Sequence, residues 1–174
     1  MKIFKFSILI LFIAACNAPQ AVYDYDQEVN FDQYSTYQLF PDFRTGLSQL
    51  DESRLTESLV SALPQKGFSK GDADPDIYVN VYTEQYQQDN RSRVGVGFGG
   101  GGGNVGVGVS GGIPVGQMDT YLRLTFDFID VEKDILVWQA VVESPFKFDA
   151  DPKSKQEQFN KIVAEAMEGY PPKK

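Results

Sequence analysis

The 174-residue sequence contains no histidine and a single cysteine, Cys16, which limits the chemistry its side chains can do. Without histidine, the chain lacks Ser-His and Cys-His nucleophile pairs, the usual zinc ligands and the commonest general base. A pair of carboxylates at a set separation, as in glycoside hydrolysis, is the remaining catalytic possibility, and spacing along a sequence does not establish such a pair. The composition therefore favours a non-enzymatic protein, and we assign no catalytic residue.

Three aspartates, Asp72, Asp74 and Asp76, have the spacing with which a calcium-binding loop begins. Such a loop needs glycine at its sixth position and glutamate at its twelfth, where this chain has Ile77 and Thr83. The pattern favours a solvated acidic turn. We therefore expect neither a metal site nor a cofactor.

Gly95, Gly97 and Gly100 match the spacing of a dinucleotide-binding fingerprint. They lie in a glycine-rich insert, residues 94–116, in which 12 of 23 residues are glycine, so this match carries little information. No helix pattern follows whose N-terminus could hold a pyrophosphate. The insert is therefore not predicted to bind a nucleotide.

The N-terminus, residues 1–15, has the features of a signal peptide, because Lys2 and Lys5 precede a short uncharged apolar run. That run is far shorter than the roughly 20 residues that span a bilayer, so a permanent transmembrane helix is not expected. Small residues before a cysteine resemble the lipobox of bacterial lipoproteins, which implies cleavage between Ala15 and Cys16 and acylation of Cys16. An ordinary secretory signal with an incidental cysteine is the alternative.

Removal of residues 1–15 would take away Lys2 and Lys5 and no acidic residue, changing the formal net charge from −8 to −10. Nucleic acid and anionic headgroups are therefore poor partners for the domain as a whole. Membrane attachment would come from the acyl chains on Cys16, since several chains anchor stably where one does not. Residues 16–20 would form the acylated cysteine and a short polar tether.

The clearest pattern of regular structure lies between Asp119 and Glu143. Apolar residues alternate with polar ones in two runs separated by a charged turn, which predicts a β-hairpin with one buried face. A one-residue slip would turn every apolar side chain to water, so we expect a firmly fixed register. The apolar positions are Leu122, Leu124, Phe126 and Phe128, then Leu136, Trp138, Ala140 and Val142.

Two amphipathic helices are expected to cover the buried face of this hairpin. The first begins at Ser48 or Asp51 and ends or kinks at Pro64, because proline removes a backbone hydrogen bond. The second begins at Asp151, or at Ser154 if that residue forms a capping box. The predicted core joins the hairpin to this second helix through Leu122, Leu124, Phe126, Trp138, Phe159, Ile162 and Val163.

Further strands are expected over residues 22–26, 36–40 and 76–85. Five strands with one apolar face each and two helices with one apolar stripe each predict an α+β fold. Its architecture would be a two-layer sandwich, with a mostly antiparallel sheet of about five strands and both helices on one face. The other face of the sheet would stay open.

The polar positions of the predicted strands suggest an interaction surface on this open face. We expect an aromatic and polar platform suited to an unknown envelope protein or a glycan, joined by Tyr86 if its strand extends so far. The alternative is that tyrosine is simply common in strands. The residues of the predicted platform are Tyr78, Tyr82, Tyr121, Arg123 and Gln139.

Several short motifs together resemble a known family. They are Asp24-Tyr25-Asp26 with Phe31 and Tyr34, Asp74-Pro75-Asp76-Ile77, the segment from Phe126 to Asp130, Val137-Trp138, and Tyr170-Pro171-Pro172. Over residues 21–172 they are similar to the domain-of-unknown-function family numbered 4136, small lipoproteins common in Bacteroidota with a glycine-rich insert at the same place. The resemblance implies a fold and a compartment, and it implies no catalytic residue.

The sequence thus predicts a single domain, residues 21–172, held by lipid on the outer membrane and facing the periplasm. We expect it to serve as a non-enzymatic interaction module of the cell envelope. A component of an envelope transport or pore-forming assembly is the alternative. The insert, residues 94–116, is expected to be a mobile loop, or else a hairpin arm whose valines contact lipid or neighbouring copies.

Overall fold

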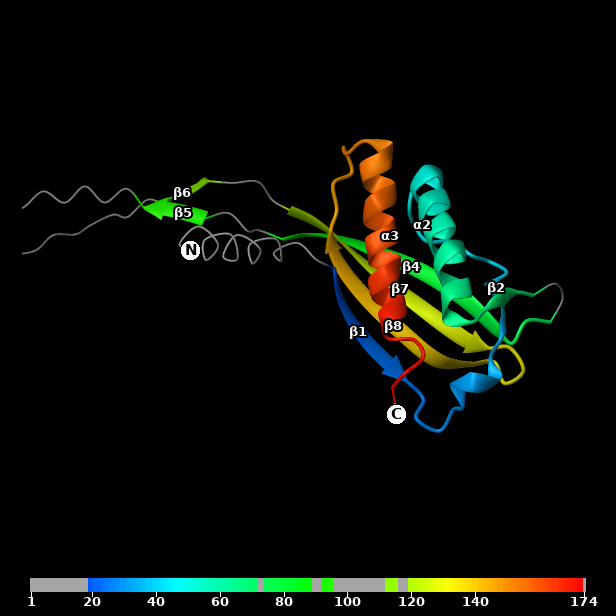
Figure 1. The fold of residues 1–174 in the computed structure, drawn as a ribbon. Coiled ribbons are helices and arrows are strands. Elements are labelled where there is room, and N and C mark those ends of the chain that lie inside the picture. Colours follow the sequence, from blue (N-terminus) through cyan, green and yellow to red (C-terminus); the bar gives the residue numbers. More distant parts are fainter. Residues whose placement is uncertain (1–18, 72–73, 89–91, 96–111, 116–118, 174) are drawn as a thin grey trace, which may run out of the picture.

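Over the residues that it describes, the computed structural model shows an α+β fold, as predicted, with an open sheet and two α-helices (Figure 1). Residues 1–15, predicted to be a signal peptide, and Cys16 lie outside the described residues, so cleavage and acylation there stay predictions. Among the described residues, no helix is both long and apolar enough to cross a membrane. The structure describes residues 19–71, 74–88, 92–95, 112–115 and 119–173.

The main sheet has six strands in the order β1-β8-β7-β4-β2-β3. The pairs β1–β8, β8–β7 and β7–β4 are antiparallel, whereas β2 lies parallel to β3 and β4. One short edge strand, β3, is additional to the five expected from the sequence. The strands are β1 (Gln20–Tyr25), β2 (Thr36–Leu39), β3 (Ser69–Lys70), β4 (Ile77–Gln88), β7 (Asp119–Asp130) and β8 (Ile135–Pro145).

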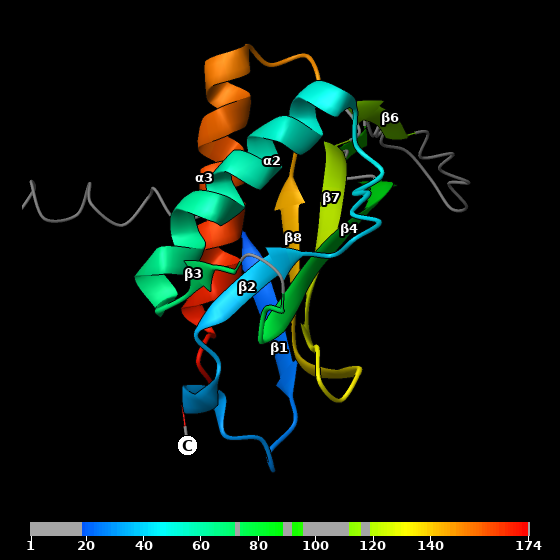
Figure 2. The same cartoon turned by 90° about the vertical axis from the view of Figure 1, so that its right-hand side faces the viewer.

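Both helices, α2 (Gln49–Ala62) and α3 (Pro152–Glu168), cover the same face of this sheet (Figure 2). Ser48 caps α2, and a 3-10 turn, η3 (Leu63–Lys66), replaces the last helical turn where Pro64 stands. Asp151 caps α3 by accepting hydrogen bonds from the backbone of the first turn. Of the two predicted starts for α3, Asp151 is therefore correct and Ser154 is wrong.

A second 3-10 turn, η2 (Phe31–Gln33), connects β1 to β2 and adds Phe31 to the core. β1 is itself fastened to the helical layer by Tyr23, whose hydroxyl donates to the Glu165 carbonyl over 2.6 Å. A side chain at Gly169 would collide with the Tyr23 ring, since its Cβ would lie 2.3 Å from that ring. Glycine there permits the close approach of β1 to the end of α3.

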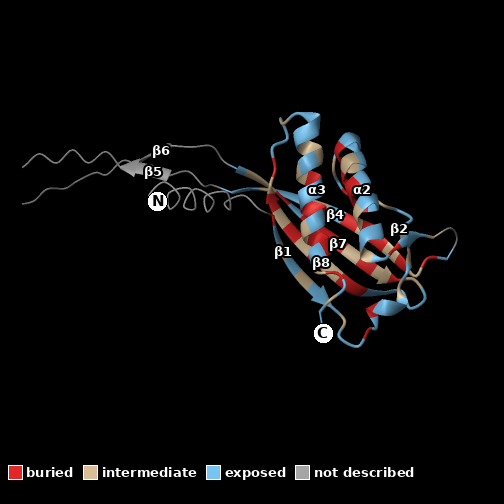
Figure 3. Cartoon of the chain, viewed as in Figure 1, coloured by how far each residue is buried: buried red, intermediate tan, exposed pale blue. Residues whose placement is uncertain are grey.

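The core lies between the sheet and the helices, and all seven predicted core residues are buried (Figure 3). At its centre, the Trp138 ring lies 4.7 Å from that of Phe128 and 5.5 Å from that of Tyr170, between centroids. Burying three aromatic rings against each other removes a large apolar area from water. This cluster joins β7, β8 and the chain after α3.

The expected alternation fails at one point in the hairpin. Leu136 was predicted to be on the buried face, but it is 48% exposed and its neighbour Val137 is buried. The cause is a β-bulge: Phe128 pairs with Trp138, whereas Ile129 pairs with Leu136, so Val137 is an extra residue in β8. A bulge shifts the facing of every residue beyond it by one position.

The ends of the glycine-rich insert form a separate two-stranded sheet. Here β5 (Ser92–Gly95) pairs antiparallel with β6 (Gly112–Val115). The mobile-loop interpretation did not anticipate this pairing, which fits the hairpin alternative at the base of the insert. Residues 96–111, on which the rest of that prediction falls, lie outside the described residues.

Candidate functional site

The register of the sheet places all five predicted platform residues on one face, opposite the helices. Across β4, β7 and β8, Tyr82 pairs with Thr125, Glu84 with Arg123, and Asp127 with Gln139. Because paired residues point to the same side of a sheet, the rows they form extend across the strands. We call this surface the open face. Its predicted members are Tyr78, Tyr82, Tyr121, Arg123 and Gln139.

Arg123 is the centre of one polar row on the open face. Its guanidinium contacts Glu143 at 2.5 Å on β8 and Glu84 at 3.5 Å on β4. The hydroxyl of Tyr86 donates to Glu143 over 3.1 Å, and the Tyr86 ring stacks on Tyr121 with centroids 5.6 Å apart. The hydrogen bonds from Arg123 lower the pKa of the Glu143 carboxyl. These side chains are thus held in one arrangement before any partner binds.

A second polar row crosses the middle of the open face. It consists of Asp24 on β1, Gln139 on β8, Asp127 on β7 and Asn80 on β4. Gln139 donates from its amide nitrogen to the Asp127 carboxylate over 2.8 Å. Burial nevertheless raises the pKa of Asp127, since one amide bond does not replace the water that its neighbours exclude. We call this set the central row.

Apolar side chains lie on both sides of the central row. On one side, the adjacent row contains Val22, which is 71% exposed, and Tyr82, which is 42% exposed. On the other side lie Tyr78 and the exposed Leu136. The open face therefore combines hydrogen-bonding groups with apolar and aromatic flanks. Such a surface suits a partner that has both polar edges and apolar faces.

A shallow hollow of about 250 Å³ lies at the β1 end of the central row. Its size is just below that of sites that bind small ligands. Asp24 and Gln139 belong to both the row and the hollow, so the two form one continuous surface. The hollow is lined by Asp24, Tyr25, Asp26, Leu136, Val137, Trp138 and Gln139.

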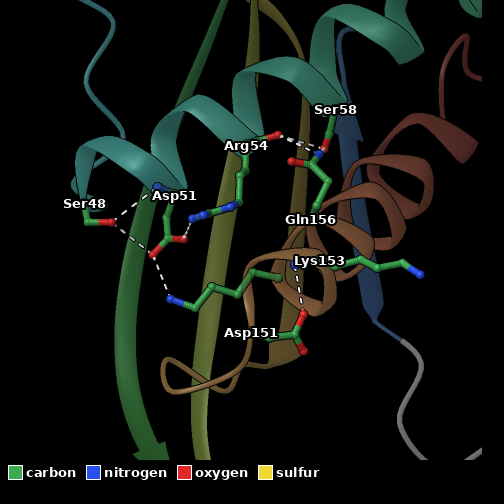
Figure 4. A network of polar contacts seen from close by, with 8 residues as sticks. Ser48, Asp51, Arg54, Ser58, Asp151, Lys153 and Gln156 are labelled. Atoms are coloured by element: carbon green, nitrogen blue, oxygen red, sulfur yellow. Dashed lines mark hydrogen bonds and ion pairs between the residues drawn. The ribbon is translucent and has the colours of Figure 1, made fainter.

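A different polar cluster lies between the two helices, away from the open face (Figure 4). Asp51 is only 4% exposed, and it contacts Arg54 at 2.6 Å and Lys155 at 3.4 Å. Gln156 on α3 also donates to Ser58 on α2 over 2.9 Å. All of these groups have partners within the cluster. Its evident effect is to fasten α2 to α3.

The acidic segment that mimics a calcium loop has a structural explanation. Asp76 accepts hydrogen bonds of 2.8 Å from the backbone nitrogens of Ser35 and Thr36, and these bonds lower its pKa. It thereby fixes the start of β2 beside that of β4. Asp72 lies outside the described residues. In the part of the chain that the structure describes, no cluster of acidic or cysteine side chains could hold a metal ion.

The structure also brings residues to the open face that the sequence did not identify as site residues. Asp127, Glu84 and Glu143 belong to its polar rows. Tyr86, which was expected there only if its strand extended so far, also lies on the open face because β4 continues to Gln88. Alternation within a strand indicated which side each residue faces. It carried no information about which residue lies opposite on the next strand, and that pairing creates the rows.

A family model described as "Domain of unknown function (DUF4136)" matches residues 21–172. The chain belongs to this family. The resemblance inferred from short motifs is therefore confirmed. The family description names no activity, so the DUF4136 match alone assigns no role to the open face. A comparison with curated proteins gave no match.

Two solved structures are similar to this DUF4136 protein in fold. One is a PDZ domain protein from Parabacteroides distasonis ATCC 8503, with a TM-score of 0.53 and 15% identity; the match covers 97% of this chain and 40% of that one. The other is the PelC dodecamer from Paraburkholderia phytofirmans, with a TM-score of 0.50 and 10% identity, covering 86% of this chain and 94% of that one. The DUF4136 chain thus spans less than half of the PDZ domain protein. At these identities, the likeness shows the fold alone.

Proposed function

We propose that this DUF4136 protein is a lipid-anchored, non-enzymatic interaction module of the cell envelope, placed on the outer membrane and facing the periplasm. In this proposal its partner binds the open face. The observation that carries it is the arrangement of that face: ordered polar rows, flanked by exposed apolar and aromatic side chains, on the side of the sheet opposite α2 and α3.

The polar groups of the open face support binding more than catalysis. Arg123 contacts two carboxylates, Glu143 and Glu84, and Gln139 donates a hydrogen bond to Asp127. The pKa of Glu143 is lowered, so that this carboxylate stays ionised and serves as an acceptor, as a recognition group does. Fixed side chains lose little conformational entropy on binding, which favours affinity.

The chemistry of the face points to the kind of partner. Carboxylates outnumber cations on it, so an anionic partner would be repelled, and a neutral or basic protein or glycan would be accepted. Tyr78 and Tyr82 stand two positions to either side of Asn80 on β4, which offers aromatic surface around a group that both donates and accepts hydrogen bonds. The proposal therefore includes an envelope protein or a glycan of neutral or positive charge.

The test compares surface variants in solubilised envelopes. Tyr82→Ala and Gln139→Glu change the open face, while Val60→Ala removes a comparably exposed side chain, 41% accessible, from α2. We expect co-purification of a protein or polysaccharide to fall at least about tenfold for both open-face variants, the effect of roughly 1.4 kcal/mol, and to be unchanged for Val60→Ala. Equal recovery with all three variants would contradict the proposal.

Lipid attachment is tested separately. The distance from Cys16 to the first strand is four residues, so an acylated Cys16 would hold the domain close to its membrane. We expect Cys16→Ser to leave an unprocessed precursor, because processing of a lipoprotein requires the modified cysteine. A substituted chain that is cleaved normally and still fractionates with membranes would contradict the lipid anchor.

A second candidate function is membership of an envelope transport or pore-forming assembly. The observation that favours it is the likeness in fold to the PelC dodecamer over 86% of this chain. Here a second copy would be the first partner, and the mass of the detergent-solubilised protein would be a multiple of the monomer mass. A monomer by light scattering that still binds through the open face would favour the first proposal.

A further inference from the structure

In the part of the chain that the structure describes, β1 forms one edge of the main sheet (Figure 1). It pairs with β8 through all six of its residues, from Gln20 with Glu143 to Tyr25 with Trp138. No described strand pairs with its other side. One side of β1 therefore carries backbone groups that the sheet does not use.

The register shows which residues carry these outward backbone groups. Asp26, directly after β1, donates its backbone N–H to the Val137 carbonyl over 3.0 Å. Backbone groups alternate in direction along an antiparallel strand, so those of Ala21, Tyr23 and Tyr25 point away from β8. Among the described residues, the N–H groups of Ala21 and Tyr23 have no hydrogen-bond partner. They can bond to the carbonyls of another strand.

The two edges of the main sheet differ in how they are protected. Proteins protect a strand edge with a bulge, a proline, a lysine or a very short strand, and β3, at the opposite edge, has only two residues. β1 has a continuous register with β8 and contains neither proline nor lysine. Its one charged residue is Asp24, whose carboxylate accepts a hydrogen bond of 2.9 Å from the Tyr25 N–H. The edge is thus open to a strand whose charge complements a carboxylate.

The side chains beside this edge are apolar and acidic. Val22, on the open face, is 71% exposed, more than any other large apolar side chain in the described residues, and Asp24 on the same face is exposed. Tyr23 lies on the helix side, where burial raises the pKa of its hydroxyl and the carboxylates of Glu165 and Glu168 raise it further. An added strand would therefore meet acidic groups on both sides of the sheet.

These carboxylates have no cation beside them in the described residues. No ion pair there includes Asp24, Glu165 or Glu168. A second copy would bring the same carboxylates to the edge, in a chain whose formal net charge is −8. Like charges that face each other across a strand pair are destabilising, which disfavours pairing of β1 with β1 of a second copy. A basic strand complements this edge.

We propose that β1 binds an extended basic segment of a partner protein, which adds to the sheet as an antiparallel strand. The antiparallel direction continues the pairing of β4, β7, β8 and β1 and is the more stable one per residue. Hydrogen bonds to the backbone of Ala21 and Tyr23 supply affinity, and side chains opposite Val22 and Asp24 supply specificity. The segment therefore carries an apolar and a basic side chain two residues apart.

The probe is an acetylated and amidated peptide that repeats threonine, valine, threonine and lysine twice. Calorimetric titration measures its affinity for the full-length protein in detergent. A second peptide has glutamate in place of lysine. Two further peptides are N-methylated, one at its threonines and the other at its valines and lysines. When valine and lysine lie opposite Val22 and Asp24 in an antiparallel pair, the threonine N–H groups point to β1 and the other N–H groups point away.

We expect the peptide that is methylated at valine and lysine to bind as tightly as the parent peptide. Affinity should fall at least about tenfold for the peptide methylated at threonine, which loses its hydrogen bonds to β1, and for the glutamate peptide, which is repelled. Equal affinities of the two methylated peptides would overturn the proposal, because pairing with a strand edge would then make no contribution.

A pair of protein variants tests the charge of the edge. Asp24→Asn keeps an oxygen for the Tyr25 N–H and removes the charge, so the parent peptide should bind about two- to fivefold more weakly, the effect of one exposed ion pair. Glu57→Gln, at an exposed position of α2, is the matched control and should change nothing. Equal affinity of the two variants would overturn the assignment of a basic partner.

Hydrogen exchange locates the bound peptide. The amides of Ala21 and Tyr23 should become protected when the peptide binds. Protection that is present without peptide and grows with protein concentration would overturn the proposal, because a second copy would then occupy the edge. Tyr82→Ala, which changes the open face, should bind the peptide with unchanged affinity. Loss of the open-face partner and loss of the edge strand are therefore separate results.

Discussion

Tyr34 and Asp130, 96 residues apart in the sequence, are joined by a hydrogen bond of 2.7 Å from the tyrosine hydroxyl to the carboxylate. This bond fastens the turn after β1 to the end of β7. Burial and the neighbouring Asp130 raise the pKa of Tyr34 to about 12. Burial alone would raise the pKa of Asp130 too, but the bonds from Tyr34 and Lys133 outweigh it and leave that pKa below its usual range.

We predict that Tyr34→Phe lowers the free energy of unfolding by about 1.5 to 3 kcal/mol at pH 7, the value of a hydrogen bond to a charged group. A carboxyl whose pKa is lowered by folding stabilises the protein above its unfolded pKa and loses this effect as the pH falls. The difference between the two proteins should therefore shrink below about pH 4. Urea titrations over pH 3 to 7 measure it. Tyr25→Phe, which removes a partly exposed hydroxyl, should cost less than about 0.5 kcal/mol.

The β-bulge in β8 leads to a second prediction. Trp138→Ala should cost about 3 to 5 kcal/mol, because Trp138 is fully buried among aromatic rings. Leu136→Ala, two residues away, should cost less than about 1 kcal/mol, because Leu136 is 48% exposed. Chemical denaturation of both variants measures this contrast. Similar losses for the two would mean that the alternation continues through position 137 without a bulge.

The contrast between these two residues also shows how far the sequence alone could lead. Alternation placed Leu122, Leu124 and Phe126 correctly, because each strand there keeps a strict period of two. The same rule failed at Leu136, since a bulge depends on how β8 pairs with β7 and leaves no mark on the period within β8. The sequence offered two possible N-caps for α3, Asp151 and Ser154, and only the geometry of the structure decided between them.

The open face was likewise predicted only in part from the sequence. Strand periodicity and the count of helices sufficed to place Tyr82, Arg123 and Gln139 on an open face. The contacts of that face depend on register, which pairs Arg123 with both Glu84 and Glu143 and Gln139 with Asp127. Register is fixed by tertiary packing over the whole sheet, so no local pattern could have revealed these pairs.

The buried Asp51 provides a third prediction. Asp51→Asn leaves Arg54 and Lys155 in place without their carboxylate, and both cations are less than 20% exposed. We expect a loss of about 2 to 3 kcal/mol, less than the 3 to 5 of a fully buried pair because water still reaches the cations. Lys153→Ala breaks an exposed pair with Glu157 and should cost less than about 1 kcal/mol. Thermal unfolding of the two variants at one pH compares them, and equal losses would contradict the structural importance of Asp51.

The pH dependence of stability that we predict for Asp127 has the opposite sign to that for Asp130. Burial raises its pKa, so the ionised carboxylate costs stability at neutral pH, and this cost disappears as the pH falls through the folded pKa. Asp127→Asn keeps an oxygen that can accept the Gln139 hydrogen bond and removes the charge. We therefore predict a higher free energy of unfolding for Asp127→Asn at pH 7 and no difference at pH 3. The control Asp42→Asn, at an exposed pair with Arg44, should leave stability unchanged at both values. A loss of stability at pH 7 would mean that the carboxylate is required on the open face.

The last prediction concerns the glycine-rich insert in the absence of a membrane. β5 and β6 pair only with each other in the described sheets, so the six-stranded core contains no hydrogen-bond ladder that depends on them. Replacing residues 94–116 by a two-residue turn would also shorten the connection between β4 and β7, and each halving of a flexible loop favours folding by only about 0.6 kcal/mol. We therefore predict that the unfolding midpoint of the detergent-solubilised protein changes by no more than about 4 °C, and that any change is upward.

Calorimetry measures the midpoint, and hydrogen exchange of Val79 and Phe126 in the centre of β4 and β7 checks that the core is intact. A fall of 10 °C or more, well beyond the roughly 4 to 8 °C that a loss of 1 kcal/mol causes in a small domain, would place the insert within the folded core.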